Sequence, residues 1–311
     1  MKAKIKQITA VLLAVIFLVV ILPVTLTRVF DSGYETPKLQ VRVAMANGQV
    51  RTIPLEEYLI GVVAAEMPAV FESEALKAQA VAARTYVLKR MGEAQTNCFD
   101  VDATENTQAW NSNRQLFRKW GIINYYKYHR KIAQAVADTR GQVLTYNNKL
   151  IDAVYHSSSG RKNTERAGDV WSNETGYLTN VPSGETTPLR FVKQQVFDAQ
   201  TFYTLLDFST PPAQFSANDL MLIERTQAGR VKTLAVRNRV FAGTDFRTRL
   251  QLPSTDIEWH LQSDKIELII YGKGHAVGMS QYGANDLAKA GRKYKQILGH
   301  YYPGTKLEKV Y

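Results

Sequence analysis

Hydrophobic and polar residues along the chain follow two different periods, and the shorter period predicts β-hairpins. Residues 39–55 alternate between apolar and polar side chains and contain Asn47-Gly48, a dipeptide typical of a tight hairpin turn. A second alternating stretch turns at Asn147-Asn148 and ends in a run of serines. Both stretches are therefore predicted to form pairs of antiparallel strands.

The longer period predicts helices. Apolar residues recur at helical spacing in three segments, which are 54–67, 73–91 and about 113–138. Pro54 suits the first turn of the first helix and Pro68 closes it, while Ser73 is a plausible N-cap of the second. The third is expected to end before Gly141. Two further helices are expected near the C-terminus, after about Ser280.

The order of these elements favours an α+β fold of mixed helices and antiparallel hairpins. Helices and hairpins are segregated rather than alternating as β-α-β units, and no internal repeat is present. Residues 161–190 are rich in Gly, Ser, Thr, Asn and Pro and are expected to form a long surface loop. Residues 191–255 mix a short helix with basic strands, and residues 265–274 form a further strand.

The N-terminal segment predicts a membrane anchor. Residues 8–27 are almost wholly apolar and long enough to cross a bilayer, and three lysines precede them. A cleaved signal peptide is the alternative, but no small-x-small cleavage site follows. The expected organisation is a cytoplasmic N-terminus over 1–7, a single transmembrane helix over 8–27, a linker over 28–37 and an extracytoplasmic domain over 38–311.

Composition and charge limit the classes of molecule that the protein is expected to bind. The 311 residues carry a formal net charge of +11, which favours polyanions such as nucleic acid, anionic lipid or anionic cell-wall polymer. The basic residues are scattered, and no nucleic-acid-binding motif is present, so we expect no nucleic-acid partner. Cys98 is the only cysteine, which excludes an internal disulfide.

Glu66 is the first candidate for chemistry. Leu55, Leu59, Val62 and Glu66 fall on one face of the first helix, so the carboxyl shares the apolar stripe that packs inward. A carboxyl in such surroundings loses hydration and its pKa is expected to rise, as a general acid requires. The alternative is that the helix frays at Pro68 and Glu66 turns to solvent, and the pattern alone does not decide between them.

Two further clusters combine polar groups with glycines. His156 directly follows a strand and precedes Ser157, Ser158 and Ser159, an arrangement suited to hydrogen bonding with sugar hydroxyls; an ordinary serine-rich turn is the alternative. His275 lies among glycines that allow a sharp turn or close approach to a ligand, and its alternative is a packed histidine at a strand-to-helix turn.

Other chemistries find little support. The serines are not set in a G-x-S-x-G elbow, so a serine nucleophile is not expected. The five histidines and Cys98 are spread out with no metal-binding spacing, and the acids near Cys98 more often solvate a loop than bind a cation. We therefore predict no metal and no cofactor.

Three segments together resemble a known family. Residues 53–91 ("IPLEEYLIGVVAAEMPAVFESEALKAQAVAARTYVLKRM"), 155–163 ("YHSSSGRKN") and 272–305 (beginning "GKGHAVGMSQYGANDLAKAG") are similar, in content and order, to the stage II sporulation protein D family, which includes the amidase enhancers. The resemblance runs from about residue 38 to the C-terminus and is looser over 185–255, a possible insertion.

The resemblance implies an activity. It points to a membrane-anchored lytic transglycosylase that cleaves the β-1,4 bond between N-acetylmuramic acid and N-acetylglucosamine in glycan strands stripped of stem peptides, leaving 1,6-anhydro-muramic acid ends. It implies action in septal wall thinning and forespore engulfment, at the mother-cell membrane, with two partners: the amidase stage II sporulation protein P, and stage II sporulation protein M. A non-catalytic glycan-binding activator of an N-acetylmuramoyl-L-alanine amidase is the alternative.

The resemblance also implies roles for residues in a glycan-binding cleft. Glu66 matches the family's catalytic acid/base, and the substrate-binding positions are Arg84, His156, Ser157, Ser158, Ser159, His275, Ser280, Gln281 and Tyr282. Trp110, Tyr155 and Tyr282 are candidates for stacking on sugar rings, although each is more simply explained as core. Arg161 and Lys162 depart from the family pattern and make the serine loop more basic. The cysteine and histidine cluster that some relatives use for zinc is missing, so no metal is carried over.

Overall fold

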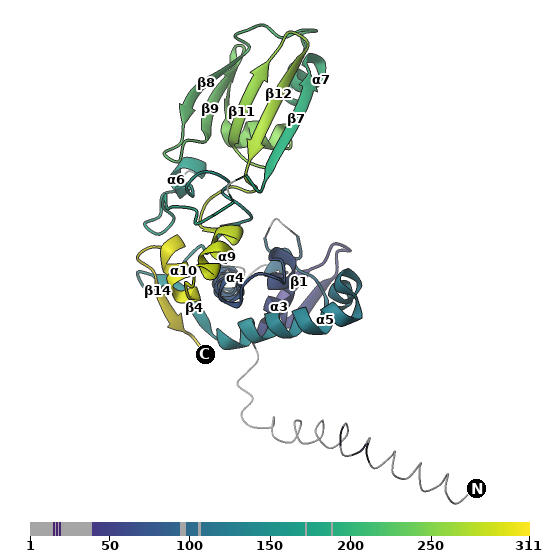
Figure 1. Ribbon diagram of the computed structural model, residues 1–311, viewed down its shortest axis with the longest axis vertical. Helices are drawn as coiled ribbons and strands as arrows, with labels where there is room; N and C mark the ends of the chain where they lie inside the picture. The colour runs from purple at the N-terminus through teal and green to yellow at the C-terminus, as the bar shows by residue number, and fades with distance from the viewer. Residues whose placement is uncertain are drawn as a thin grey trace, which may run out of the picture. The chain divides into compact units, whose positions relative to one another are not determined.

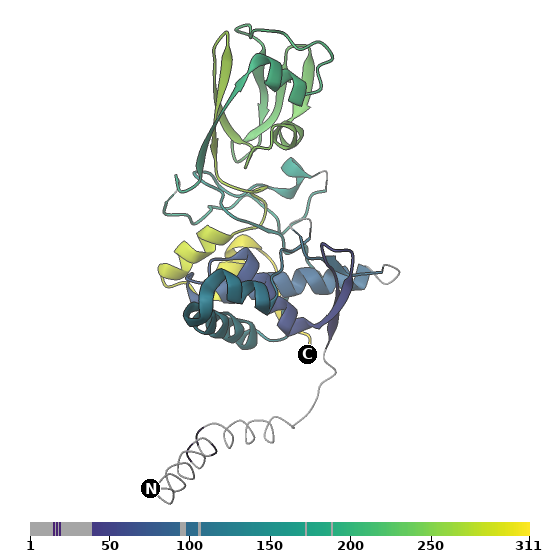
Figure 2. The same cartoon turned by 90° about the vertical axis from the view of Figure 1, so that its right-hand side faces the viewer.

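The computed structural model describes residues 15, 17, 19, 39–93, 98–104, 107–171, 173–187 and 189–311. Contacts between Cα atoms divide the chain into two compact units, Met1–Gln40 and Val41–Tyr311. The second unit contains the residues that are candidates for function, and Figures 1 and 2 show how its elements are arranged.

The second unit combines helices with short strands. Its helices are α3 (Leu55–Glu66), α4 (Ser73–Glu93), α5 (Asn113–Asp138), α6 (Ala167–Val170), α7 (Ala199–Leu205), α8 (Gly243–Arg249), α9 (Gln281–Lys289) and α10 (Tyr294–Tyr301). Its strands, the first of which begins at the unit boundary, are β1 (Gln40–Ala44), β2 (Val50–Pro54), β3 (Val101–Asp102), β4 (Gln142–Tyr146), β5 (Lys149–Leu150), β6 (Tyr155–His156), β7 (Val192–Asp198), β8 (Leu220–Arg225), β9 (Val231–Val236), β10 (Arg239–Ala242), β11 (Asp256–Leu261), β12 (Lys265–Tyr271), β13 (Met279–Ser280) and β14 (Lys306–Lys309).

Helix α4 is the centre of the first hydrophobic core. It contacts α3, α5, α9, α10 and β4, so that elements from both ends of the unit surround it (Figure 1). Residues 78–83 are mostly alanine and are all buried. Because short side chains reduce the distance between packed elements, several neighbours can approach this helix at once.

The second core is built from residues 199–270 and is mainly β-structure. Strands β11, β12 and β7 form one antiparallel sheet and β10, β9 and β8 form another, with α7 and α8 packed beside them (Figures 1 and 2). Along β12, every second residue is buried, namely Ile266, Leu268 and Ile270. This alternation is the pattern of a strand with one face in the core. The predicted boundaries of the looser segment over 185–255 stay a prediction.

The local predictions from the sequence are largely confirmed, and the fold is α+β. Helices α3, α4 and α5 match the predicted segments within two residues, although the helical path of α5 breaks at Gly121, where φ is 70°. The turn between β4 and β5 contains Asn147 and Asn148 with φ of 51° and 60°. Two successive positive φ values are typical of the tight hairpin turn that this dipeptide predicted.

The prediction of a membrane-spanning helix over residues 8–27 is wrong. Within the residues that the structure describes, no helix is long and apolar enough to cross a membrane. Apart from residues 15, 17 and 19, the predicted segment lies outside that part of the chain, as do 1–7 and 28–37. The prediction rested on apolar composition, whereas a span also requires one unbroken helix of about 20 residues. The described residues therefore support the α+β class, but they support neither the predicted anchor nor the single-pass membrane localisation that depended on it.

Candidate functional site

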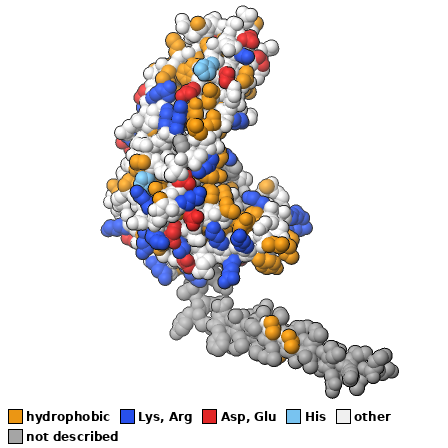
Figure 3. All heavy atoms as spheres, viewed as in Figure 1, with side chains coloured by type: hydrophobic (Ala, Val, Ile, Leu, Met, Phe, Trp, Pro, Cys, Tyr) orange, Lys and Arg blue, Asp and Glu red, His pale blue; other side chains and the backbone are white. Residues whose placement is uncertain are grey.

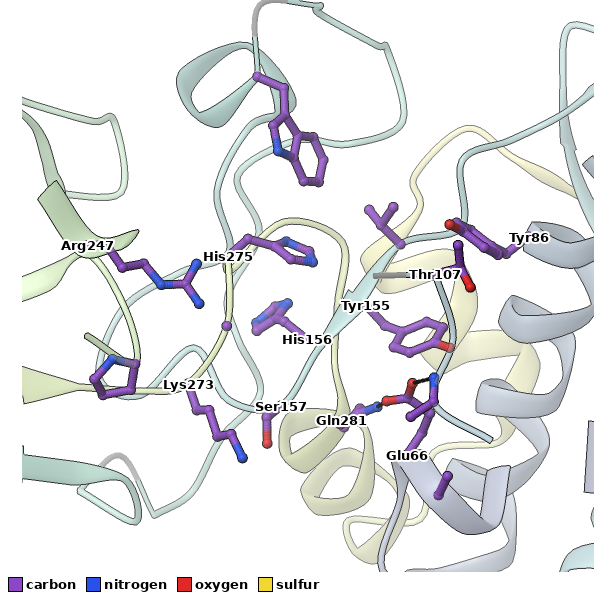
Figure 4. Close-up of a pocket in the computed structure, with 16 residues that line it drawn as sticks. Glu66, Tyr86, Thr107, Tyr155, His156, Ser157, Arg247, Lys273, His275 and Gln281 are labelled. Atoms are coloured by element: carbon purple, nitrogen blue, oxygen red, sulfur yellow. Dashed lines mark hydrogen bonds between the residues drawn. The ribbon is translucent and has the colours of Figure 1, made fainter. Parts of the chain in front are cut away.

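A pocket of about 520 Å³ brings together the polar residues that the sequence singled out. Its walls come from the end of α3, from α4, from the loops around β6 and β13, and from α8 at the edge of the second core (Figure 4). The lining residues are Ala65, Glu66, Tyr86, Thr107, Ala109, Val154, Tyr155, His156, Ser157, Trp171, Arg247, Pro253, Lys273, Gly274, His275 and Gln281.

Glu66 is the last residue of α3, and its side chain lines the pocket. The helix ends here because Met67 is extended, as expected of a residue that precedes proline. Two donors orient the carboxylate: the backbone N–H of Ala109 lies 2.9 Å from Oε1, and Nε2 of Gln281 lies 3.2 Å from Oε2 (Figure 4). Glu66 is thus partly buried and faces a polar pocket, so it neither packs into the apolar core nor turns freely to solvent.

A chain of hydrogen bonds runs beside Glu66. The Tyr58 hydroxyl donates to Oε1 of Gln108 at 3.2 Å, and Nε2 of Gln108 donates to the Tyr155 hydroxyl oxygen at 3.1 Å. Burial, with a further contribution from the charge of Glu66, raises the pKa of Tyr155 well above 10, so this residue stays a neutral phenol. Because its oxygen accepts from Gln108, its own O–H is available as a donor in the pocket.

His156 is buried and held in one tautomer. Its Nδ1 lies 3.1 Å from the carbonyl oxygen of Val277, which can only accept, so Nδ1 carries the proton. Its Nε2 lies 2.7 Å from Oγ of Ser159 and therefore accepts that hydroxyl. Burial lowers the pKa of His156 well below 6.5, and the positive charges of Arg230 and of His275 in its protonated form act in the same direction. His156 is thus neutral, and its hydrogen bond with Ser159 stabilises the serine loop, residues 157–159.

Parallel pairing of β6 with β13 joins the serine loop after His156 to the glycine-rich segment around His275. Met279 pairs with Tyr155 and Ser280 with His156, which places Gln281 beside Glu66. This approach requires Gly278, because a Cβ there would lie 2.2 Å from the carbonyl oxygen of Val154. The glycines around His275 therefore serve the close contact of two backbones.

His275 lies in the pocket beside a second aromatic ring. Its Nδ1 accepts the backbone N–H of Val277 at 3.1 Å, and its ring centroid lies 5.0 Å from that of Trp171. Burial and the nearby Arg247 guanidinium lower the pKa of His275 to about 4, against a smaller opposing effect of a hydrogen bond with the backbone of Tyr155. At neutral pH the pocket therefore contains two uncharged imidazoles.

The two buried histidines predict a loss of stability in acid. Each has a folded-state pKa below its unfolded value near 6.5, so protons bind the unfolded chain more tightly and stability falls as the pH drops. For His275 the loss develops between about pH 6.5 and pH 4 and reaches at most about 3 kcal/mol. Urea denaturation at a series of pH values should show this decline.

Variants assign that decline to the pocket. His275→Gln should make the decline in the free energy of unfolding over this interval less steep, with the contribution of His156 remaining, whereas His260→Gln, a change outside the pocket on β11, should leave the decline as in the parent. An unchanged pH dependence in His275→Gln would show that another group causes the acid instability.

Glu185 is a second buried acid that the sequence did not single out. Its carboxylate accepts the Ser158 hydroxyl at 2.6 Å, the Ser159 backbone N–H at 2.6 Å and the Ser280 hydroxyl at 2.9 Å. Burial raises its pKa, while these three donors and Arg190 oppose that rise. Glu185 therefore ties the serine loop to the start of α9 behind the pocket and does not line it.

Several predicted site residues lie outside the pocket. Ser158 and Ser159 are buried in the Glu185 network, and Ser280 caps α9 by accepting the Gly283 backbone N–H. The Tyr282 ring packs against Phe71 and Phe191. Trp110 borders a different pocket, next to Gly61. Of the predicted residues, those that the structure brings together are Glu66, Tyr155, His156, Ser157, His275 and Gln281.

Arg84 also lies away from the pocket. Its side chain is fully buried, and its guanidinium donates to both carboxylate oxygens of Glu56 at 2.9 and 2.7 Å. Further bonds reach the carbonyl oxygens of Val136 at 3.2 Å and Gln142 at 3.3 Å. These contacts connect α3, α4, α5 and β4, so the Arg84 side chain stabilises the packing of the first core.

The basic residues after the serine loop are also paired. Arg161 lies 3.1 Å from Asp256 and 2.8 Å from Glu258, and Lys162 lies 2.9 Å from Asp256. Because Asp256 is fully buried, these ion pairs fasten the loop to β11. The departure from the family pattern thus adds a connection between the loop and the second core.

The structure adds pocket residues that the sequence reasoning missed. Trp171, Arg247, Lys273 and Tyr86 all line the pocket. Trp171 and Arg247 arrive from a surface loop and from the second core, and no local pattern marked them. Lys273 lies within the glycine-rich segment around His275. Because the sequence analysis had singled out that segment, its position could have indicated Lys273 as a pocket residue.

Metal ligands are not gathered in the described part of the chain. There, no group of three or more His, Cys, Asp or Glu side chains is placed to hold a metal ion, and Cys98 is exposed and has no disulfide partner. On the face shown in Figure 3, Lys and Arg side chains lie scattered among acidic and polar ones.

Comparison with known proteins identifies the family. A family model described as "Stage II sporulation protein" (SpoIID) matches residues 45–146. The chain is 39% identical to stage II sporulation protein D of Bacillus subtilis, over 91% of this chain and 84% of that protein. It is 38% identical to its namesake in Bacillus amyloliquefaciens, over 85% and 77%.

An amidase enhancer of Bacillus subtilis is 32% identical over 80% of this chain, although the match covers only 40% of the enhancer. The residues that the family model matches include helix α4 and, from the pocket, Ala65, Glu66, Tyr86, Thr107 and Ala109. With this degree of identity over most of both chains, the protein belongs to the stage II sporulation protein D family, a family of bacterial sporulation proteins.

Proposed function

We propose that the pocket cleaves peptidoglycan glycan strands as a lytic transglycosylase, with Glu66 as its acid and base. The observation that carries the proposal is that, among the described lining residues, Glu66 is the sole carboxylate. Most glycoside hydrolases require two carboxylates, one as acid and one as base or nucleophile. A reaction in which the substrate supplies its own nucleophile requires only one.

Glu66 alone can carry out both proton transfers of this reaction. The protonated Glu66 gives its proton to the glycosidic oxygen as the bond to C1 of N-acetylmuramic acid breaks. The C6 hydroxyl of the same sugar attacks C1, and the Glu66 carboxylate takes the proton of that hydroxyl. The products are a free 4-hydroxyl on N-acetylglucosamine and a 1,6-anhydro ring, and Glu66 returns to its protonated state.

Neighbouring side chains have matching roles in this proposal. Ala109 and Gln281 fix the orientation of the Glu66 carboxylate, and the Tyr155 hydroxyl is free to donate to the sugar. Ser157 and the neutral His275 also line the pocket and supply further hydrogen-bonding groups (Figure 4). Trp171, partly exposed beside His275, offers an apolar face to a pyranose ring.

Membership of the stage II sporulation protein D family supports a role of the chain in sporulation. We propose that the substrate is glycan from which an amidase has removed the stem peptides, and that the reaction contributes to septal wall thinning and engulfment. In this proposal stage II sporulation proteins P and M act with the chain. The similarity to stage II sporulation protein D and to an amidase enhancer supports the link to such machinery.

The purified chain tests the proposal on peptidoglycan pretreated with an amidase. We expect the glycan strands to shorten with time, as measured by size-resolved chromatography. Strands of unchanged length, at a protein concentration that saturates binding, would contradict a glycan-cleaving activity.

A second function has a specific observation in its favour. The similarity to an amidase enhancer supports a non-catalytic role in which the pocket binds glycan and activates an amidase. The release of stem peptides by an amidase, with and without the chain, distinguishes the two. Equal acceleration by the parent and by Glu66→Gln, with no change in strand length, would favour this second function.

A further inference from the structure

Two cations in the pocket have no acidic partner among the described residues. Arg247 donates through Nε to the carbonyl oxygen of Leu252 at 3.2 Å, and within the described part of the chain neither it nor Lys273 forms an ion pair. Other basic residues around the site are neutralised locally: Arg161 and Lys162 by Asp256, Arg190 by Asp286 and Arg230 by Glu165.

The two cations lie across the pocket from Glu66. Arg247 comes from α8 and Lys273 follows β12, so both belong to the edge of the second core, whereas Glu66 ends α3 of the first (Figure 4). This separation matters because a cation beside Glu66 would stabilise its ionised form and oppose its role as an acid. Cations on the far wall can instead contact another part of the same substrate.

The guanidinium of Arg247 is partly buried, and an anionic partner would stabilise it. Burial lowers the pKa of Arg247, and in the described part of the chain its guanidinium donates to the carbonyl oxygen of Leu252 rather than to a carboxylate. A cation that has lost hydration gains most from a charged hydrogen-bond partner, and a guanidinium matches the two oxygens of a carboxylate. The exposed Lys273 adds a second positive charge on the same wall.

We propose that Arg247 and Lys273 bind the free lactyl carboxylate of N-acetylmuramic acid and thereby select glycan strands that have lost their stem peptides. This inference rests on the proposed function, because it takes the glycan strand as the ligand of the pocket. It adds the group that is recognised and the residues that recognise it.

The chemistry of the substrate agrees with this placement. In an intact strand the lactyl group is joined to the stem peptide through a neutral amide, and removal of the peptide by an amidase exposes a carboxylate. N-acetylglucosamine has no ionised group, so this carboxylate is the charge that a stripped strand presents. It is attached to C3 of the ring, away from the C1–oxygen bond that Glu66 acts on, as a cation site across the pocket requires.

Binding to two matched glycans tests the inference. Strands from amidase-treated peptidoglycan are compared with the same strands after carbodiimide coupling to ammonia, which converts the lactyl carboxylates to neutral amides. The full chain carrying Glu66→Gln binds both without cleaving them. We expect it to bind the carboxylate form about 10-fold tighter or more, the effect of a hydrogen bond between charged groups.

The variants assign this selectivity to the two cations. Arg247→Gln combined with Lys273→Gln should remove the preference, so that the variant binds the carboxylate and the amidated strand with equal affinity. The control is Arg249→Gln with Lys265→Gln, which removes the same net charge from residues outside the pocket. This control should keep the preference for the carboxylate strand. Lys273→Gln alone alters an exposed side chain, so it separates lost recognition from misfolding and should weaken the preference by itself.

The outcomes separate this inference from the proposed function. Equal affinity of the parent for both strands, or a preference that survives the double substitution, would overturn carboxylate recognition even if the parent shortens glycan. A preference that depends on Arg247 and Lys273, in a chain that never cleaves glycan, would establish the recognition site and refute the transglycosylase.

Discussion

Glu66→Gln is expected to reduce glycan cleavage by about 10²–10⁴-fold, the range for removal of a general acid or base. Glutamine has nearly the same shape, and its one carbonyl oxygen can still accept the Ala109 N–H, although its NH2 group cannot accept from Nε2 of Gln281. It can neither protonate the glycosidic oxygen nor accept the proton of the C6 hydroxyl. The rate of strand shortening, measured on amidase-treated peptidoglycan, gives the effect on the reaction.

A matched control comes from the same helix. Glu57→Gln removes an exposed acid of α3 that does not line the Glu66 pocket, and it should leave the cleavage rate unchanged. Glycan affinity should survive in both variants, because the rest of the pocket is intact. If Glu66→Gln cleaved at the rate of the parent, Glu66 could not be the catalytic acid.

Arg84→Ala is expected to lower the free energy of unfolding by about 3–5 kcal/mol, the cost of breaking a buried ion pair by removing one partner. The change leaves Glu56 without its bidentate partner and strips donors from the carbonyl oxygens of Val136 and Gln142. Urea denaturation monitored by tryptophan fluorescence measures the effect. Arg90→Ala, an exposed arginine of the same helix, should cost less than about 1 kcal/mol.

Stability and activity together decide the role of Arg84. The sequence resemblance suggested that this residue binds substrate, whereas its burial favours a role in holding the first core together. A variant that kept full stability and lost glycan affinity would support substrate binding. A destabilised variant that binds normally at low temperature would support the structural role.

Features of the fold that depend on neighbouring residues in the sequence could be predicted from the sequence. Helices α3, α4 and α5 were predictable because a dozen or more residues repeat one spacing and because proline and serine mark their ends. The turn at Asn147-Asn148 was predictable because these residues tolerate positive φ. Gly121, which breaks α5, carried no such signal, since a lone glycine is tolerated inside a helical pattern.

The geometry of the site depends on contacts between distant segments. Strands β6 and β13 have only two residues each, too few to show a period, yet their pairing brings Gln281 to Glu66. Glu185 lies in a segment whose composition predicted only a surface loop. Arg247 reaches the pocket because the second core packs beside it, and nothing around it in the sequence indicates that position.

The resemblance and the geometry contributed different parts of the site. Glu66, His156 and Gln281 were chosen from sequence segments and do lie together at the pocket. Ser158, Ser159 and Ser280 belong to the same segments but turn inward to Glu185, because a buried carboxylate needs donors and these serines supply them. Similar sequence context therefore did not distinguish lining residues from supporting ones.

The most direct test of the central claim is the chemical nature of the new glycan ends. The chain is incubated with amidase-treated peptidoglycan in water enriched in ¹⁸O, and the fragments are analysed by mass spectrometry. A one-carboxylate transglycosylase predicts muramic acid ends that are lighter than reducing ends by one water and contain no label from the solvent. Reducing ends that carry the label would contradict the account, because they would show that water, and not the C6 hydroxyl, attacks C1.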